Sequence, residues 1–170
     1  MGATEDLNLI FKSIIDTVDD LRDSNRLEVL GDKASEIIRE RTRKGLGVRP
    51  TTKRRFKLPA LSKSYKDFRQ RYRALLHPET DVNKSNLTLS GQMLDSIGIK
   101  IRANDTVIIG PKGPRLPFLP GQKRPPSNEV VAGFAEFGER PFITMSQKDQ
   151  RILVDFYEKV FDSLLKRKKL

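Results

Sequence analysis

The chain has 170 residues, enough for one domain with length to spare for a long loop or arm. Its net charge of +11 favours an acidic or anionic partner, and the lack of cysteine excludes disulfides, thiol nucleophiles and thiolate metal sites. Hydrophobic residues make up only 36% of the chain, which allows a thin core, and no apolar run approaches the ~20 residues that span a bilayer.

The first part of the chain predicts two helices followed by a basic arm. Apolar residues at helical spacing favour an amphipathic helix over residues 7–21. The pair Gly31–Asp32 indicates a break, after which a second helix is expected over residues 32–44. Gly45 is a suitable C-cap, and the basic stretch that follows predicts a loop or an exposed hairpin.

A helix with a basic outer face is predicted in the next segment. Ser62 and Ser64 can cap a helix over residues 63–76, and Pro78 stops it. Aromatic and leucine residues form its apolar stripe, whereas cationic residues occupy the outer face. These outer residues are Lys66, Arg69, Arg71 and Arg73.

The middle of the chain predicts a short helix and a β-hairpin. Ser90 is expected to cap a helix over residues 91–96, whose apolar residues point inward. Apolar and polar residues then alternate over 97–102, which is typical of a half-buried strand. After an Asn-Asp turn, residues 106–109 are expected to return as the partner strand.

The last third predicts a long loop, two helices and an edge strand. Residues 110–127 are rich in Pro, Gly and basic residues, so no regular element fits them. A helix is expected over 128–137, an edge strand over 141–145 and a final helix after Ser146. The predicted apolar face of the first helix consists of Val130, Val131, Phe134 and Phe137.

These elements suggest an organisation with arms on one main body. The predicted parts are an N-terminal helix, 1–31, a main domain, 32–165, and a basic tail, 166–170. Two segments, 45–61 and 110–127, are expected to form extended arms, because apolar anchors lie inside otherwise irregular sequence.

No residue pattern predicts catalysis. His77 is the only histidine and lies outside any nucleophile or metal motif, so it is best explained as a surface or capping residue. Glu136 and Glu139 form no acid–base motif, and Glu136 is better explained as an ion-pair partner of Arg140 or as a cap. We therefore expect no enzyme activity, no cofactor, no bound metal and no small-molecule substrate.

The charge of the chain is concentrated in a predicted basic patch. Its residues are Arg41, Arg43, Lys44, Arg49, Lys53, Arg54, Arg55 and Lys57. Such a run is often only a solvated face, but its density favours an acidic partner. One hypothesis is therefore a module that binds nucleic acid nonspecifically, since no sequence-reading motif is present.

Two motifs support a different hypothesis through a family resemblance. The segment Leu87–Ile97 resembles the Thr/Ser-Gly-x-Leu-x-x-Ser-Ile segment of head–tail junction proteins of tailed bacteriophages, namely the gp10-like, virion-morphogenesis and tail-completion families. Glu136–Gly138 followed by Arg140–Ile143 is similar to the Glu-Phe-Gly and Arg-Pro-Phe stretch of these proteins. Residues 41–45 and 58–62 also look like the tail-completion branch.

The resemblance implies an α+β domain, with a small antiparallel sheet and a β-hairpin packed against several helices. It also implies a structural virion protein of the neck, assembled in the host cytoplasm. Such a protein forms a homo-oligomeric ring that completes or terminates the tail and contacts portal, head-completion, tail-tube or tail-terminator proteins. Nonspecific contact with packaged DNA is compatible with its charge, and no membrane partner is expected. The predicted interface residues are Phe56, Leu58, Leu116, Phe118, Leu119, Arg140 and Phe142.

Overall fold

The computed structural model describes residues 24–103, 106–117, 119 and 121–167. Within these ranges the chain forms five α-helices and two antiparallel two-stranded sheets, which confirms the predicted α+β class. The helix expected over residues 7–21 and the expected anchor Phe118 lie outside the described residues. No helix in the described ranges is long and apolar enough to cross a membrane.

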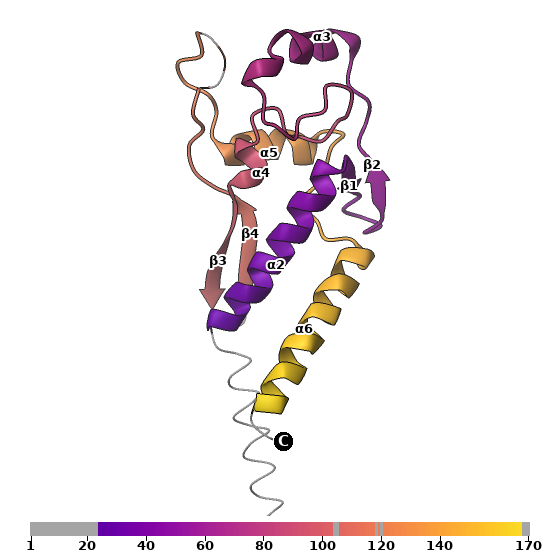
Figure 1. Cartoon of the computed structure of the whole chain (residues 1–170), viewed down its shortest axis with the longest axis vertical. Helices are drawn as coiled ribbons and strands as arrows, with labels where there is room; N and C mark the ends of the chain where they lie inside the picture. The colour runs from indigo at the N-terminus through magenta and orange to yellow at the C-terminus, as the bar shows by residue number, and fades with distance from the viewer. Residues whose placement is uncertain (1–23, 104–105, 118, 120, 168–170) are drawn as a thin grey trace, which may run out of the picture.

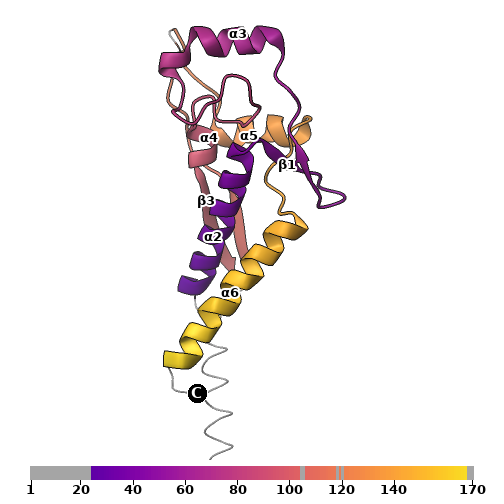
Figure 2. The same ribbon diagram turned by 45° about the vertical axis from the view of Figure 1, so that its right-hand side comes forward.

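Two long helices and a hairpin form one end of an elongated molecule (Figures 1 and 2). Helix α2, Ser24–Arg43, contacts both α6, Gln147–Arg167, and the hairpin of β3, Ile97–Ala103, with β4, Thr106–Pro111. The strands pair antiparallel, with Ile99 opposite Ile109, as the alternating sequence predicted. Helices α3, α4 and α5 lie toward the other end.

Helix α2 continues through Gly31, so the predicted break at this glycine is wrong. A Cβ atom at Gly31 would lie 2.8 Å from Val107 Cγ1 and 2.9 Å from Ile99 Cγ2. The glycine therefore serves a close approach between helix and hairpin rather than a chain reversal. The predicted glycine stop at Gly45 is confirmed, since its φ is +79° and its N–H donates to the carbonyl of Thr42.

The basic arm after α2 is a small hairpin rather than an irregular loop. Strand β1, Leu46–Val48, pairs antiparallel with β2, Arg55–Lys57. The N–H of Leu58 donates to the carbonyl of Gly45 at 2.8 Å, which closes the base of the hairpin. This hairpin is one of the two forms that the sequence predicted.

Helix α3, Lys63–Arg71, begins as predicted, because the Ser62 hydroxyl accepts a hydrogen bond from the Tyr65 N–H at 3.3 Å. A 3₁₀ turn, Arg73–Leu75, follows it. Arg69 was expected on the outer face of this helix, and that expectation is wrong because its side chain is buried.

The burial of Arg69 has a clear physical reason. Its Nη1 donates to the carbonyl oxygens of Asp81 and Lys84, each at 2.8 Å. These carbonyls belong to the irregular segment between the 3₁₀ turn and α4, and a buried backbone acceptor without a partner is costly. The arginine thus fastens this segment to the helix.

The short helix α4, Gln92–Asp95, is confirmed, but its predicted cap is not. Gly91, with φ +70°, occupies the N-cap position, and no side chain caps the helix. The Ser90 hydroxyl instead accepts a hydrogen bond from Arg115 Nη2 at 3.0 Å. The main apolar core lies beside this helix and consists of Ile38, Met93, Leu94, Ile97, Ala132 and Phe142.

Helix α5, Asn128–Phe137, is followed by a segment without strand structure, so the edge strand expected over 141–145 is wrong. In this segment, most of the backbone hydrogen bonds are made with side chains. Glu136 Oε2 accepts the N–H groups of Phe142 and Ile143 at 2.8 and 3.1 Å. The Glu-Phe-Gly motif therefore holds the chain that leaves α5, in keeping with the capping explanation of Glu136.

A buried ion cluster joins the start of α6 to the rest of the molecule. The fully buried carboxylate of Asp149 forms ion pairs with Arg41 of α2 and with Arg55 of β2. Ser146 caps α6 reciprocally, because its hydroxyl accepts the Asp149 N–H while its own N–H donates to the carboxylate. Arg41 also donates to the carbonyl oxygens of Phe142 and Thr144.

The environment of Asp149 stabilises its charged form. Burial by itself raises the pKa of a carboxyl group, yet hydrogen bonds from Ser146 and Arg55 and the charge of Arg41 outweigh it and hold the pKa below its usual value. A lowered folded-state pKa adds stability above the unfolded-state value, and this contribution is lost as the pH falls through the folded-state pKa.

We expect Gly31→Ala to lower the free energy of unfolding by about 1–3 kcal/mol, because the added methyl overpacks the contact between α2 and the hairpin. Gly133→Ala in α5 is the matched control, since nothing lies within 4 Å of its Cβ position, and should stabilise by about 0.5–1 kcal/mol. Urea denaturation measures both. Equal effects of the two substitutions would contradict the close approach.

We expect Asp149→Asn to lower the free energy of unfolding by about 3–5 kcal/mol, because two arginines lose their shared counter-charge. Because the variant has no carboxyl group at position 149, its free energy of unfolding should also fall less than that of the unaltered chain as the pH drops below about 4. Denaturant titrations at several pH values measure both effects.

The control for this substitution is Asp155→Asn, at an exposed position on α6, which should change stability by less than about 0.5 kcal/mol. An Asp149→Asn variant as stable as this control would show that the cluster is dispensable.

Candidate interaction surface

The described residues contain no group of three or more His, Cys, Asp and Glu side chains that could hold a metal ion. His77 lies in a turn, where its Nδ1 accepts a hydrogen bond from the Glu79 N–H at 3.2 Å. Its Nε2 lies 3.6 Å from a carboxylate oxygen of Asp95. The geometry around the only histidine is that of a turn residue.

The structure divides the predicted basic patch into two groups. Arg41 and Arg55 are paired with the buried Asp149, and Arg41 is itself buried whereas Arg55 is half-buried. Arg43 bridges Glu79 at 2.8 Å and Asp95 at 2.6 Å. These three members of the predicted patch therefore already pair with acidic residues that are distant in sequence, and Arg41 is also buried.

The remaining members of the basic patch are exposed on or next to the β1–β2 hairpin. They are Lys44, Arg49, Lys53, Arg54 and Lys57. Near the tip, Lys53 has a φ of +54°, and its carbonyl accepts the N–H of Gln147 at 3.2 Å. The tip is thus attached to the start of α6, and the five cations extend into solvent around it.

Two predicted interface residues are core residues instead. Phe142 is 0% exposed and packs in the main core, where Glu136 and Arg41 bind its backbone N–H and carbonyl. Leu58 is also buried, at the base of the basic hairpin. Their predicted role in contacts between subunits is therefore wrong, since the chain itself covers both side chains.

The other described members of the predicted interface lie nearer the surface. Phe56 and Leu119 are half-buried, and Leu116 is 72% exposed. The backbone of Leu116 is held firmly, because its N–H and carbonyl both bond to the side-chain amide of Gln92, at 2.6 and 3.0 Å. The long loop therefore presents an apolar side chain from a fixed backbone position.

The most exposed apolar surface lies on α5. Phe137 is 95% exposed, Phe134 is 75% exposed and Val130 is 47% exposed. The sequence predicted Val130, Val131, Phe134 and Phe137 as the apolar face of this helix, but only Val131 packs against the core and the other three are exposed. The buried residues of α5 are Asn128 and Ala132.

The orientation of α5 follows from hydrogen bonds at its start. The side chain of Asn128 donates to the carbonyl of Lys112 at 3.1 Å, and its N–H donates to the carbonyl of Gly113 at 3.1 Å. Glu129 accepts the N–H of Gly113 at 2.7 Å. These bonds turn the small Ala132 to the core and leave both phenylalanines outside. The small residues were the only sequence signal for this orientation.

Comparisons of the chain with protein-family models, with curated proteins and with solved structures gave no match.

We expect Phe142→Ala to lower the free energy of unfolding by about 3–5 kcal/mol, because it leaves a cavity in the core. Phe137→Ala removes an exposed ring and should change stability by less than about 0.5 kcal/mol in dilute protein. Chemical denaturation of both variants measures the difference. A large loss of stability for Phe137→Ala in dilute protein would show that the Phe137 ring packs in the core.

Proposed function

We propose that this chain is a structural protein of the neck of a tailed-phage virion. It forms a ring that completes or terminates the tail and joins it to portal and head-completion proteins. The observation that carries the proposal is the exposed aromatic face of α5. The resemblance of the two sequence motifs to head–tail junction proteins gives the proposal its biological setting.

The exposed aromatic face supports an assembly role on energetic grounds. Burying one large apolar side chain contributes about 1.5–3 kcal/mol, and aromatic residues are enriched among the residues that dominate binding energy. Phe134 and Phe137 remain in water in the single chain. Contact with another subunit would remove this cost.

Of the two motifs that resemble the family, the Glu-Phe-Gly motif lies directly at this face. Glu136 is part of α5 and binds the backbone of the segment that follows, so Phe137 is held in place by the same local structure. A ring needs a different patch on the next subunit. Val29 on α2 and Ile108 on β4 are exposed apolar side chains that supply candidates for that patch.

The test is the mass of the purified full chain by light scattering, alone and mixed with portal-proximal or tail-tube proteins. We expect a closed oligomer, or a ring that forms only with those partners. Phe134→Ser and Phe137→Ser should leave the chain monomeric, because they remove the apolar contact. Val154→Ser on α6, which is 53% exposed, is the matched control and should assemble normally.

Two outcomes would contradict this proposal. One is normal assembly of both phenylalanine variants. The other is a monomer that ignores these partners but binds random DNA, with a log–log salt slope near −0.9 per phosphate contact. That result would favour the nonspecific nucleic-acid module, with the exposed cations of the hairpin as its contacts.

A further inference from the structure

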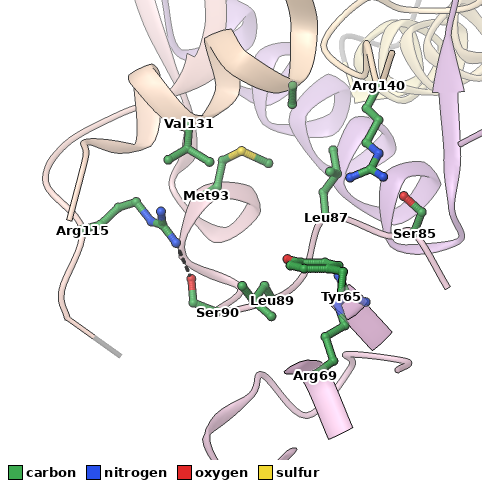
Figure 3. A pocket seen from close by; sticks show the side chains of 11 residues that line it. Tyr65, Arg69, Ser85, Leu87, Leu89, Ser90, Met93, Arg115, Val131 and Arg140 are labelled. Atoms are coloured by element: carbon green, nitrogen blue, oxygen red, sulfur yellow. Dashed lines mark hydrogen bonds between the residues drawn. The ribbon is translucent and has the colours of Figure 1, made fainter. Parts of the chain in front are cut away.

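A small cavity of about 160 Å³ lies between α3, the segment 85–90, α4 and α5 (Figure 3). Three arginine side chains line it, Arg69, Arg115 and Arg140. They come from α3, from the long loop and from the segment after α5, so the fold brings together cations that are distant in sequence. None of the described residues that line the cavity is Asp or Glu.

The arginines differ in how far the chain already satisfies them. Arg69 is fastened to two carbonyls, but its buried Nε has no hydrogen-bond partner. Arg115 donates to Ser90, and burial lowers the pKa of its guanidinium, an effect that the proximity of Tyr65 opposes. Arg140 is half-buried and makes no ion pair or hydrogen bond within the described part of the chain. A cation held partly out of water in this way favours an anion beside it.

A buried hydroxyl gives a second indication that the cavity suits a polar ligand. Ser85 lines the cavity, its Oγ is buried, and this oxygen has no hydrogen-bond partner among the described residues. A buried polar atom without a partner costs about 1–3 kcal/mol. A ligand with a polar group would remove that cost.

The cavity also has an apolar wall. Leu87, Leu89 and Met93 line one part, and Val131 and Ala135 of α5 line another. Such a wall suits a methylene stem, whereas the arginines suit the charged end of the same group. A volume near 150 Å³ holds a group of about the size of benzene, so one side chain fits where a nucleotide does not.

The cavity adjoins the exposed face of α5 through shared lining residues. Leu87, Ala135 and Arg140 also line a neighbouring surface hollow, together with Phe134 and the exposed Glu139. Phe134 in turn lines a further hollow with Phe137. A chain lying over the phenylalanines can therefore place a side chain in the cavity.

We propose that this cavity receives the carboxylate of a Glu or Asp side chain from an acidic protein segment that lies along α5. The inference deepens the assembly role proposed above and rests on it, because it names the chemistry of the contacting segment. A carboxylate can accept paired N–H groups from a guanidinium, and such charge-assisted bonds are stronger than neutral ones. The apolar wall and the neighbouring aromatic face favour a protein segment over a phosphate backbone.

The first experiment is NMR of the full chain labelled with ¹⁵N, observing the arginine Nε–H signals. The probe is N-acetylglutamate N-methylamide, and the uncharged comparison is N-acetylglutamine N-methylamide. We expect saturable shifts at Arg115 and Arg140 with the glutamate probe only. Arg140→Gln should weaken binding by about tenfold or more, because it removes a charge-assisted contact.

The matched control is Arg54→Gln on the exposed hairpin, which makes the same change of charge without touching the cavity and should bind the probe normally. A second arm replaces the probe with inorganic phosphate. Saturation by phosphate at lower concentration than by the glutamate probe would overturn the inference in favour of a phosphate-bearing partner. Equal shifts with the glutamine probe, or none with either, would also overturn it.

Mass measurements separate this inference from the proposed function. If the ring forms but Arg140→Gln assembles normally and no probe binds, the carboxylate site is wrong and the assembly role stands. If the probe binds at Arg140 but neither the chain alone nor its mixtures form rings, the carboxylate site stands and the neck role fails. Loss of both probe binding and assembly in Arg140→Gln, with normal behaviour of Arg54→Gln, supports both.

Discussion

The buried carboxylate of Asp149 is the interaction on which the arrangement of this chain depends. It lies between Arg41 of the first described helix and Arg55 of the basic hairpin, and it also completes the cap of the last helix. Three elements from distant parts of the sequence are thereby fixed to one another. A charge cluster of this kind costs desolvation energy, but each member loses much more if one partner is removed.

The same cluster also holds the segment that follows α5. Arg41 binds the carbonyl oxygens of Phe142 and Thr144, while Glu136 binds two N–H groups in the same segment. Side chains from α2 and α5 therefore hold the segment between the last two helices, and they place Phe142 in the core. With that position filled, the outer face of α5, which carries Phe137, has no covering element among the described residues.

Local chemistry in the sequence predicted most elements but not their orientation. Ser62 and Ser146 cap helices as expected, and Ser127 caps α5 in the same way, because capping needs only neighbouring backbone groups. Gly31 was misinterpreted as a break because its close neighbours, in β3 and β4, lie far away in sequence. The sequence did not predict the outward face of α5 or the pairing of Arg41 with Asp149. Both depend on residues that are distant in sequence, which periodicity does not identify.

The distribution of charge and apolar surface in this chain follows from one further constraint. A thin core cannot cover every amphipathic helix, so some stripes of apolar side chains must face outward. The sequence pattern of such an exposed stripe is the same as that of a buried one. On α5 the outward face adjoins a cavity that three arginines line without an acidic residue. Apolar side chains exposed to water and arginine side chains that are partly desolvated are both unfavourable in the single chain. A protein contact that covers α5 would relieve both at once, which is why we place the assembly surface there rather than on the exposed basic hairpin.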